Sequence, residues 1–229
     1  MKLSPDLLFS VPTYINPMHQ RELLLRGHKI PVIENLGVTK DLNESIDLTD
    51  NDIRVLGNFP RLLKLKTLLI SKNRISHIQP DLSESLPNIE NLVLSSNQLS
   101  QLSDIDPISG FTKLTHLSLI DNPVVNLDYY RLYVVWRNPS IRVLDFVKVK
   151  DAERSRAKEL FGPSMDQPTS LATQIMGSKS KTIQSTAEKQ ASRQLTEEEK
   201  ENIRQKLKVA TSLEEVEKLH QALRTGVLS

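Results

Sequence analysis

The sequence predicts an α/β solenoid in which stacked repeats each add one short parallel strand to a concave sheet. Three observations support this fold class. A block of spaced leucines and isoleucines recurs along the chain, most copies contain an asparagine at the same place, and the copies follow one another at a nearly constant interval. The asparagines at positions 51, 73, 97 and 122 are 22, 24 and 25 residues apart. These intervals fall in the range of about 20–29 residues that is typical of leucine-rich repeats.

Three copies of the block are complete, with the form apolar-x-x-apolar-x-apolar-x-x-Asn-x-apolar. They span residues 65–75, 89–99 and 114–124. Two upstream copies are partial: the copy ending at Ile53 lacks the first apolar position, and the copy ending at Ile30 has His28 in place of the asparagine. With a final strand over Ile141–Phe146 that has no asparagine after it, the pattern predicts about five to six repeats.

The spacing has a physical reason. The two leucines of each Leu-x-Leu unit point inward because side chains alternate between the faces of a strand. The asparagine amide can then donate to and accept from backbone groups that would otherwise be buried without partners. The rest of each repeat returns along the convex side, where we expect these apolar side chains to pack: Leu56, Phe59, Leu62, Leu102, Ile105 and Phe111. One repeat cannot bury its own face, so several stack into a curved solenoid.

We expect the leucine-rich-repeat domain to span residues 1–160, with a cap at each end. Residues 4–20 would form the N-terminal cap. The aromatic-rich stretch Tyr129–Trp136 predicts a helix that seals the last repeat. Residues 161–195 are rich in Ser, Thr, Gln, Lys and Ala, which predicts a largely irregular linker with at most a helical turn at 171–176.

Two capping boxes follow the expected linker, one beginning at Thr196 and the other at Ser212. Apolar side chains recur at helical spacing after each box, and this pattern predicts a helical hairpin over residues 196–225. Two short amphipathic helices cannot bury their apolar stripes alone. We therefore expect the hairpin to dock, either on this chain or on a partner.

The sequence lacks the motifs of an enzyme. It has no cysteine, so a disulfide framework, a thiolate metal site and a cysteine nucleophile are all excluded. Phosphate-binding and dinucleotide-binding loops are absent, the five histidines have no metal-ligand spacing, and the aspartates at 47, 50 and 52 lack the glycine and glutamate of a calcium loop. We expect no catalytic residue, no metal and no cofactor. Without a long apolar run, we expect a soluble protein of the cytosol or nucleus.

The residues that alternate with the strand leucines should line the concave face. Most are small or polar, which predicts an open trough, but several apolar side chains align across neighbouring strands and suggest a groove for an amphipathic helix. The expected partner-binding residues are Glu22, Leu24, Arg26, Asp47, Thr49, Leu69, Ser71, Val93, Ser95, His116 and Ile120.

Basic residues concentrate at or beyond the strand ends. The net charge of +2 is too small to indicate nucleic-acid binding by itself, so only local placement can do so. A row of Lys and Arg along one rim would suit a nucleic-acid backbone without reading bases, although charge runs are usually solvated faces. The candidate RNA-binding residues are Arg26, Lys29, Arg54, Lys72, Arg74, Lys148 and Lys150.

The strings that fill the repeats are more specific than the repeat consensus. The segment Arg21–Gly37 closely resembles the first-repeat signature of the U2 small nuclear ribonucleoprotein A-prime family. Leu24 stands where that signature has an acidic residue, and His28 stands where it has an aromatic one. Strings similar to later repeats, to the cap and to the tail of the family lie at 46–54, 59–60, 73–75, 104–107, 122–124, 130–133, 142–149 and 210–219.

The resemblance implies a non-catalytic scaffold of the U2 particle in the nucleus, with a role in pre-mRNA splicing. In that family the concave face grips a helix of an RRM protein, the B-double-prime subunit. The pair then holds stem-loop IV of U2 small nuclear RNA, with the RRM reading the loop and the repeat protein touching the stem. Other spliceosomal proteins would meet the C-terminal hairpin, and no membrane is involved.

The residues alone leave other interpretations open. A leucine-rich-repeat regulatory subunit of a phosphatase or another enzyme would use the same trough, but it would leave the specific strings unexplained. A histone-chaperone-like repeat protein would need a long acidic tail, whereas this tail is mixed to basic.

Overall fold

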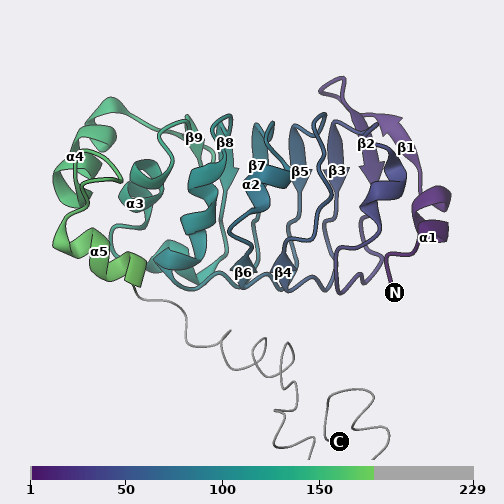
Figure 1. Cartoon of the computed structure of the whole chain (residues 1–229), viewed down its shortest axis with the longest axis horizontal. Helices are drawn as coiled ribbons and strands as arrows, with labels where there is room; N and C mark the ends of the chain where they lie inside the picture. The colour runs from purple at the N-terminus through teal and green to yellow at the C-terminus, as the bar shows by residue number, and fades with distance from the viewer. Residues whose placement is uncertain (1, 178–229) are drawn as a thin grey trace, which may run out of the picture. The chain divides into compact units, whose positions relative to one another are not determined.

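Eight strands form one sheet along the part of the chain that the structure, a computed structural model, describes: residues 2–177 (Figure 1). The strand order is β1-β2-β3-β5-β7-β8-β9-β10, with parallel pairs between β2 and β9 and an antiparallel pair at each end. The predicted α/β solenoid with parallel strands is confirmed. The strands are β1 Thr13–Ile15, β2 Arg21–Leu24, β3 Ser45–Asp47, β5 Thr67–Leu69, β7 Asn91–Val93, β8 His116–Ser118, β9 Val143–Leu144 and β10 Val147–Lys148.

The return segments of the repeats carry short and varied elements. β4 (Val55–Leu56) pairs in parallel with β6 (His77–Ile78), and the two lie along one edge of the solenoid in Figure 1. The remaining connections hold η1 Leu36–Thr39, α2 Leu82–Ser85, η2 Leu102–Gly110 and η3 Pro123–Asn126. The apolar side chains expected on the convex side, from Leu56 to Phe111, are all buried in one continuous core.

A ladder of buried asparagines joins successive repeats. The Asn73 amide donates to the carbonyls of Leu48, in the preceding repeat, and Ile70, in its own, at 3.0 and 3.2 Å. Its oxygen accepts from the Ile53 amide at 3.1 Å. Equivalent contacts surround the other ladder residues, Asn51, Asn97 and Asn122.

The residue before each ladder asparagine adopts the left-handed conformation, with φ between 53° and 60° at Asp50, Lys72, Ser96 and Asp121. Gly27, which precedes His28 in the first repeat, has φ of 75°. Glycine and aspartate tolerate this conformation better than most residues. The glycine therefore keeps the turn geometry in the first repeat, where His28 replaces the asparagine.

The N-terminal cap consists of α1 (Pro5–Ser10) and β1. The Ser4 hydroxyl accepts a hydrogen bond from the Leu7 amide and so caps the first turn of α1. Leu3 and Leu8 are buried in the same core as the repeats, so this segment covers the end of the solenoid.

Three helices form the C-terminal cap: α3 (Tyr130–Arg137), α4 (Asp151–Phe161) and α5 (Ser170–Gly177). The Phe161 ring packs edge-to-face on Tyr133, with centroids 5.4 Å apart, and lies 5.5 Å from the Trp136 ring. The aromatic residues of the predicted helix therefore seal the last repeat.

The folded unit extends past residue 160, where we expected the linker to begin. Phe161 and Ala172 are buried, and Leu171, Ile175 and Met176 of α5 pack against the core. Residues 162–169 are irregular, as expected, but α5 is a full eight-residue helix rather than a single turn, and it packs against α4, where Ala157 and Phe161 are buried. The rest of the expected linker, and the hairpin expected at 196–225, lie outside the described residues.

The last predicted strand is shorter than the pattern indicated. β9 ends at Leu144, and Asp145 and Phe146 take left-handed conformations with φ of 52° and 61°. The chain then reverses into β10, so the Phe146 side chain is 78% exposed instead of entering the core. The Asp145 carboxylate holds the turn by accepting from the Leu119 amide and the Tyr130 hydroxyl.

The helices of residues 2–177 are all too short or too polar to span a membrane.

Candidate partner-binding surface

The concave sheet face presents three rows of side chains that run across the strands. The strand register aligns Glu22, Ser45, Thr67, Asn91 and His116 in the first row and Leu24, Asp47, Leu69, Val93 and Ser118 in the second. Backbone hydrogen bonds just past the strands align the third row, which contains Arg26, Thr49, Ser71, Ser95 and Ile120. The structure therefore places every predicted partner-binding residue in one of these rows.

The apolar part of the face is centred on Leu69 and Val93. These side chains are register partners on β5 and β7, and both are half-buried. Ile120, in the next row, is also half-buried. Leu24 is separated from this group by Asp47, so it does not extend the apolar strip.

The N-terminal end of the face is a closed polar network around Glu22. The Glu22 carboxylate accepts from the Tyr14 hydroxyl at 2.5 Å, from the Asn16 amide at 2.9 Å and from the Ser45 hydroxyl at 2.8 Å. Burial raises the pKa of Glu22, but these three hydrogen bonds and the positive charge of Arg26 together outweigh burial and bring the pKa below its usual value. Glu22 is therefore a buried carboxylate that remains ionised at neutral pH.

A second buried carboxylate lies on the next strand. Asp47 accepts from the Thr49 amide at 2.9 Å and pairs with the Arg26 guanidinium at 3.1 Å. The Asp47 side chain is 6% exposed, whereas the Arg26 side chain is 59% exposed. Glu22, Asp47 and Thr49 are all buried, so this end of the trough is less open than we expected. The Glu22 carboxylate is held by Tyr14, Asn16 and Ser45, and the Asp47 carboxylate by Arg26 and by the Thr49 backbone amide.

The pattern of repeats did not identify Tyr14 and Asn16 as members of this surface. Tyr14 lies on β1, which pairs antiparallel with β2 and adds one strand to the face, and Asn16 directly follows β1. A local signal is present, because Thr13-Tyr14-Ile15 are good strand formers and the Asn16-Pro17 pair marks a turn.

Serine hydroxyls and a histidine ring occupy the other end of the face. The hydroxyls of Ser95 and Ser118 are 2.8 Å apart and share a hydrogen bond. The exposed His116 ring lies 2.8 Å from the Thr115 hydroxyl. The face therefore changes from carboxylates at β2 and β3, through apolar side chains at β5 and β7, to hydroxyls and a histidine at β8.

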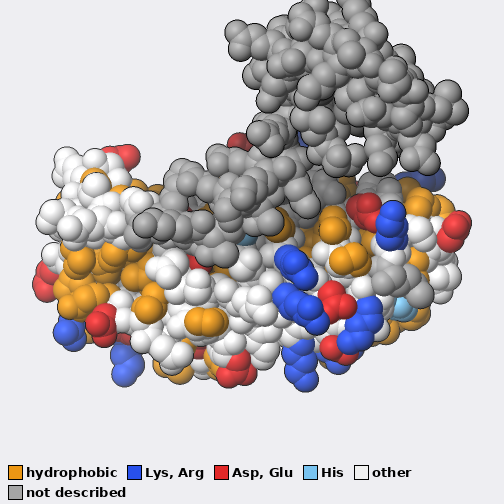
Figure 2. Space-filling model, turned by 90° about the horizontal axis from the view of Figure 1, so that it is seen from below, with side chains coloured by type: hydrophobic (Ala, Val, Ile, Leu, Met, Phe, Trp, Pro, Cys, Tyr) orange, Lys and Arg blue, Asp and Glu red, His pale blue; other side chains and the backbone are white. Residues whose placement is uncertain are grey.

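The candidate RNA-binding residues form two separate groups. All are exposed, but Arg26, Lys29, Arg54, Lys72 and Arg74 follow β2, β3 and β5, whereas Lys148 and Lys150 lie at the opposite end of the sheet. Figure 2 shows Lys and Arg gathered with Asp and Glu over the N-terminal half of the edge that carries β4 and β6. Arg74 pairs with Asp52 at 3.2 Å, beside a shallow pocket of about 550 Å³.

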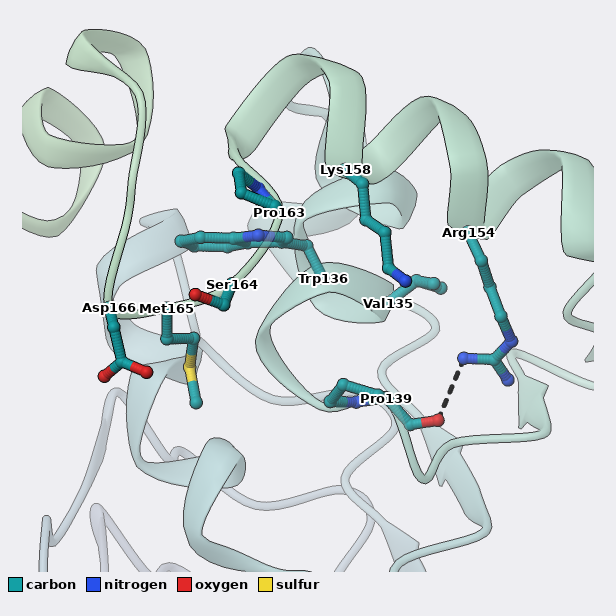
Figure 3. A pocket seen from close by; sticks show the side chains of 9 residues that line it. All are labelled: Val135, Trp136, Pro139, Arg154, Lys158, Pro163, Ser164, Met165 and Asp166. Carbon is teal, nitrogen blue, oxygen red and sulfur yellow. Dashed lines mark hydrogen bonds between the residues drawn. The ribbon is translucent and has the colours of Figure 1, made fainter.

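A second pocket, of about 510 Å³, lies at the C-terminal cap (Figure 3). The Trp136 ring lies beside Pro163, and the Trp136 indole donates to the Gly162 carbonyl at 2.9 Å. Arg154 donates to the carbonyls of Pro139 and Ile141 at 2.9 and 2.6 Å. These hydrogen bonds join α3 to the end of α4, and α4 to the loop between α3 and β9, so these polar groups serve the cap.

Neither pocket resembles a metal centre. The described residues contain no group of three or more histidine, aspartate or glutamate side chains placed to hold a metal ion.

Comparisons with known proteins agree with this architecture. A leucine-rich-repeat family model matches residues 1–175. The U2 small nuclear ribonucleoprotein A' of Aspergillus fumigatus is 48% identical over 222 residues, covering 93% of this chain and 87% of that protein. The Schizosaccharomyces pombe protein of the same name is 45% identical over 236 residues, covering 99% and 98%.

A solved structure gives the same result. In the crystal structure of the Drosophila melanogaster SNF/U2A' complex, one chain is 45% identical to this chain and superimposes with a TM-score of 0.71. The match covers 77% of this chain and 98% of that chain. The chain therefore belongs to the U2 small nuclear ribonucleoprotein A' family of leucine-rich-repeat proteins.

Proposed function

We propose that this protein is a non-catalytic scaffold of the U2 particle in the nucleus, and that its concave face binds a helix of an RRM protein. The observation that carries the proposal is the half-buried pair Leu69 and Val93 at the centre of the face. Two adjacent apolar side chains on an otherwise polar sheet suit the apolar stripe of an amphipathic helix.

Such a contact contributes to association. Fully burying an exposed side chain of this size contributes roughly 1.5–3 kcal/mol, and a half-buried side chain gains the part that corresponds to its remaining exposed area. Leu69, Val93 and Ile120 together could offset much of the entropy that two proteins lose on binding. The names of the relatives, and the solved complex of SNF with U2A', support a protein partner of the SNF type.

The same proposal includes RNA. The pair of proteins would hold stem-loop IV of U2 small nuclear RNA, with the RRM protein reading the loop. The exposed basic groups, of which Arg54 and Lys72 are the clearest examples, would then contact the phosphate backbone of the stem. Such contacts add salt-dependent affinity without sequence information.

A pull-down from nuclear extract tests this proposal. The tagged full-length chain is used as bait, with and without RNase treatment, and the recovered proteins and RNA are identified. We expect an RRM protein in both samples and U2 RNA only in the untreated one. Recovery of a phosphatase or another enzyme instead, with no RRM protein, would favour the regulatory-subunit alternative and overturn the proposal.

A further inference from the structure

We propose that Tyr14 is a further partner-binding residue, whose ring anchors a basic side chain of the bound helix. This inference rests on the proposed function. It assigns a role to the N-terminal cap, which otherwise serves only to close the solenoid.

The first step is the position of Tyr14. It lies directly opposite Glu22 in the antiparallel pair β1–β2, and directly opposed side chains project from the same face of a sheet. Tyr14 therefore begins the row that continues through Glu22 and Ser45. In Figure 1 β1 borders β2 at the N-terminal end of the sheet, so the candidate surface is one strand wider than the repeats alone provide.

The second step is the way in which the ring is held. The Tyr14 hydroxyl donates to the Glu22 carboxylate at 2.5 Å, and Glu22 is only 4% exposed. The Tyr14 side chain nevertheless remains 43% exposed. An aromatic ring that is fixed at its polar end and open to solvent loses little entropy when a partner covers it. Tyrosine is also one of the residue types that are enriched among the residues contributing most to binding.

The third step is the charge around the ring. Two ionisable carboxylates, Glu22 and Asp47, lie at this end of the face, and Arg26 is the cation that pairs with Asp47. Glu22 receives its three hydrogen bonds from neutral donors, and the single positive charge of Arg26 acts on both Glu22 and Asp47, so these three groups together carry a net negative charge. A lysine or arginine of the partner would be attracted both by the face of the ring and by this carboxylate.

Other exposed apolar side chains of the cap do not share this position. Ile15 is 63% exposed, but it lies opposite Arg21 and so belongs to the alternate positions of the β1–β2 pair. Phe9 is 75% exposed and comes from α1, outside the sheet. Phe9 therefore provides a matched control for the loss of an exposed aromatic ring.

The experiment measures the affinity of the full-length chain for the purified RRM protein recovered in the pull-down, by isothermal titration calorimetry. We expect Tyr14→Ala to weaken binding at least tenfold and Tyr14→Phe, which keeps the ring but releases it from Glu22, to weaken it two- to fivefold. Phe9→Ala should bind as the unmodified chain does. Tyr14→Leu, which retains apolar bulk, provides a second variant without the ring if Tyr14→Ala fails to fold.

The charge of the bound side chain is tested separately. Glu22→Gln should weaken binding several-fold and reduce the dependence of affinity on salt, because a partner cation would lose its carboxylate. Unchanged affinity and unchanged salt dependence in Glu22→Gln would show that the side chain on Tyr14 is not cationic, and would overturn that part of the proposal.

The outcomes separate this inference from the proposed function. If Tyr14→Ala and Tyr14→Leu fold and bind normally while acidic substitutions at Leu69 and Val93 abolish binding, then the role of Tyr14 is wrong and the proposed function stands. If none of these changes affects binding, the concave face is not the interface and both are wrong.

Discussion

The side-chain oxygen of Asn73 accepts a hydrogen bond from the amide of Ile53, 3.1 Å away in the preceding repeat. The nitrogen of the same side chain donates to carbonyls of both repeats. One amide thus satisfies backbone groups that the turn leaves without partners, and it does so across the boundary between repeats. The solenoid depends on this contact as well as on its apolar core.

We therefore expect Asn73→Ala to lower the free energy of unfolding by about 3 kcal/mol, because each buried polar group left without a partner costs about 1–3 kcal/mol. Urea denaturation followed by circular dichroism measures the change. Asn126→Ala, at an exposed position in η3, is the control and should change stability by less than about 0.5 kcal/mol. Equal stability of the two variants would show that the ladder is not a major source of stability.

The regular part of the fold could be predicted from the sequence because it depends on spacing. Asn51, Asn73, Asn97 and Asn122 occur at one place in each repeat, and the structure gives them the same contacts. The network around Glu22 could not be predicted in this way, because Tyr14 reaches it through a hairpin that lies outside the repeat pattern.

The C-terminal boundary of the repeat domain could not be predicted from the sequence for a similar reason. Phe161 precedes a long polar stretch, so composition alone marked it as the start of a linker, whereas its partners Tyr133 and Trp136 lie far back in the chain. The spacing of Ala157 and Phe161, one turn of helix apart, was the available sign that this surface needed a cover.

The C-terminal cap gives a direct test of the corrected boundary. Phe161 is fully buried among aromatic rings, so we expect Phe161→Ala to cost about 3–5 kcal/mol. Phe146→Ala removes an equally large ring that is 78% exposed, and it should cost less than about 0.5 kcal/mol. Urea unfolding midpoints compare the two. A small effect at Phe161 would mean that the domain is stable without this part of the cap.

Glu22 predicts a specific pH dependence of stability. Its pKa in the folded protein lies below the usual value, because the hydrogen bonds that it accepts and the charge of Arg26 outweigh the effect of burial. At acidic pH the folded state then binds fewer protons than the unfolded state. The contribution of Glu22 to the free energy of unfolding is therefore present above the pKa that Glu22 has in the unfolded state, and it is lost as the pH falls through the pKa that it has in the folded state. We expect thermal stability to fall on acidification below about pH 4.5, and to fall less steeply in Glu22→Gln.

The matched control for this measurement is Glu90→Gln, which removes an exposed carboxylate. It should leave the steepness of the acid transition unchanged. If Glu22→Gln and the unmodified chain lose stability in parallel as the solution is acidified, Glu22 does not contribute in this way.

The basic rim predicts a salt effect on RNA binding. Arg54 and Lys72 are exposed and follow adjacent strands of the sheet, β3 and β5. If both contact phosphates, replacing them with alanine should reduce the slope of log K against log salt by about two, or about one for each contact. Filter binding of the protein pair to the U2 stem-loop measures the slope.

Two further double variants show which basic residues account for that change in slope. Arg61→Ala with Lys64→Ala removes two exposed charges before β5 rather than after it, and should leave the slope unchanged. Lys148→Ala with Lys150→Ala tests the distant basic group. If the slope is reduced only in this last variant, the RNA contact lies at the C-terminal end of the sheet.

The most direct test of the concave face is a double substitution at its apolar centre. Leu69→Glu with Val93→Glu places two carboxylates side by side where an apolar helix face would pack, and burying an unpaired charge is strongly unfavourable. We expect binding of the RRM protein to be lost while the circular dichroism spectrum stays native, because both side chains are only half-buried. Leu42→Glu with Leu63→Glu alters two exposed leucines outside the strands and should bind normally. If the Leu69/Val93 variant folds natively and binds with unchanged affinity, the concave face is not the binding site. A helix that covered two new charges at the centre of this face would lose much of its affinity.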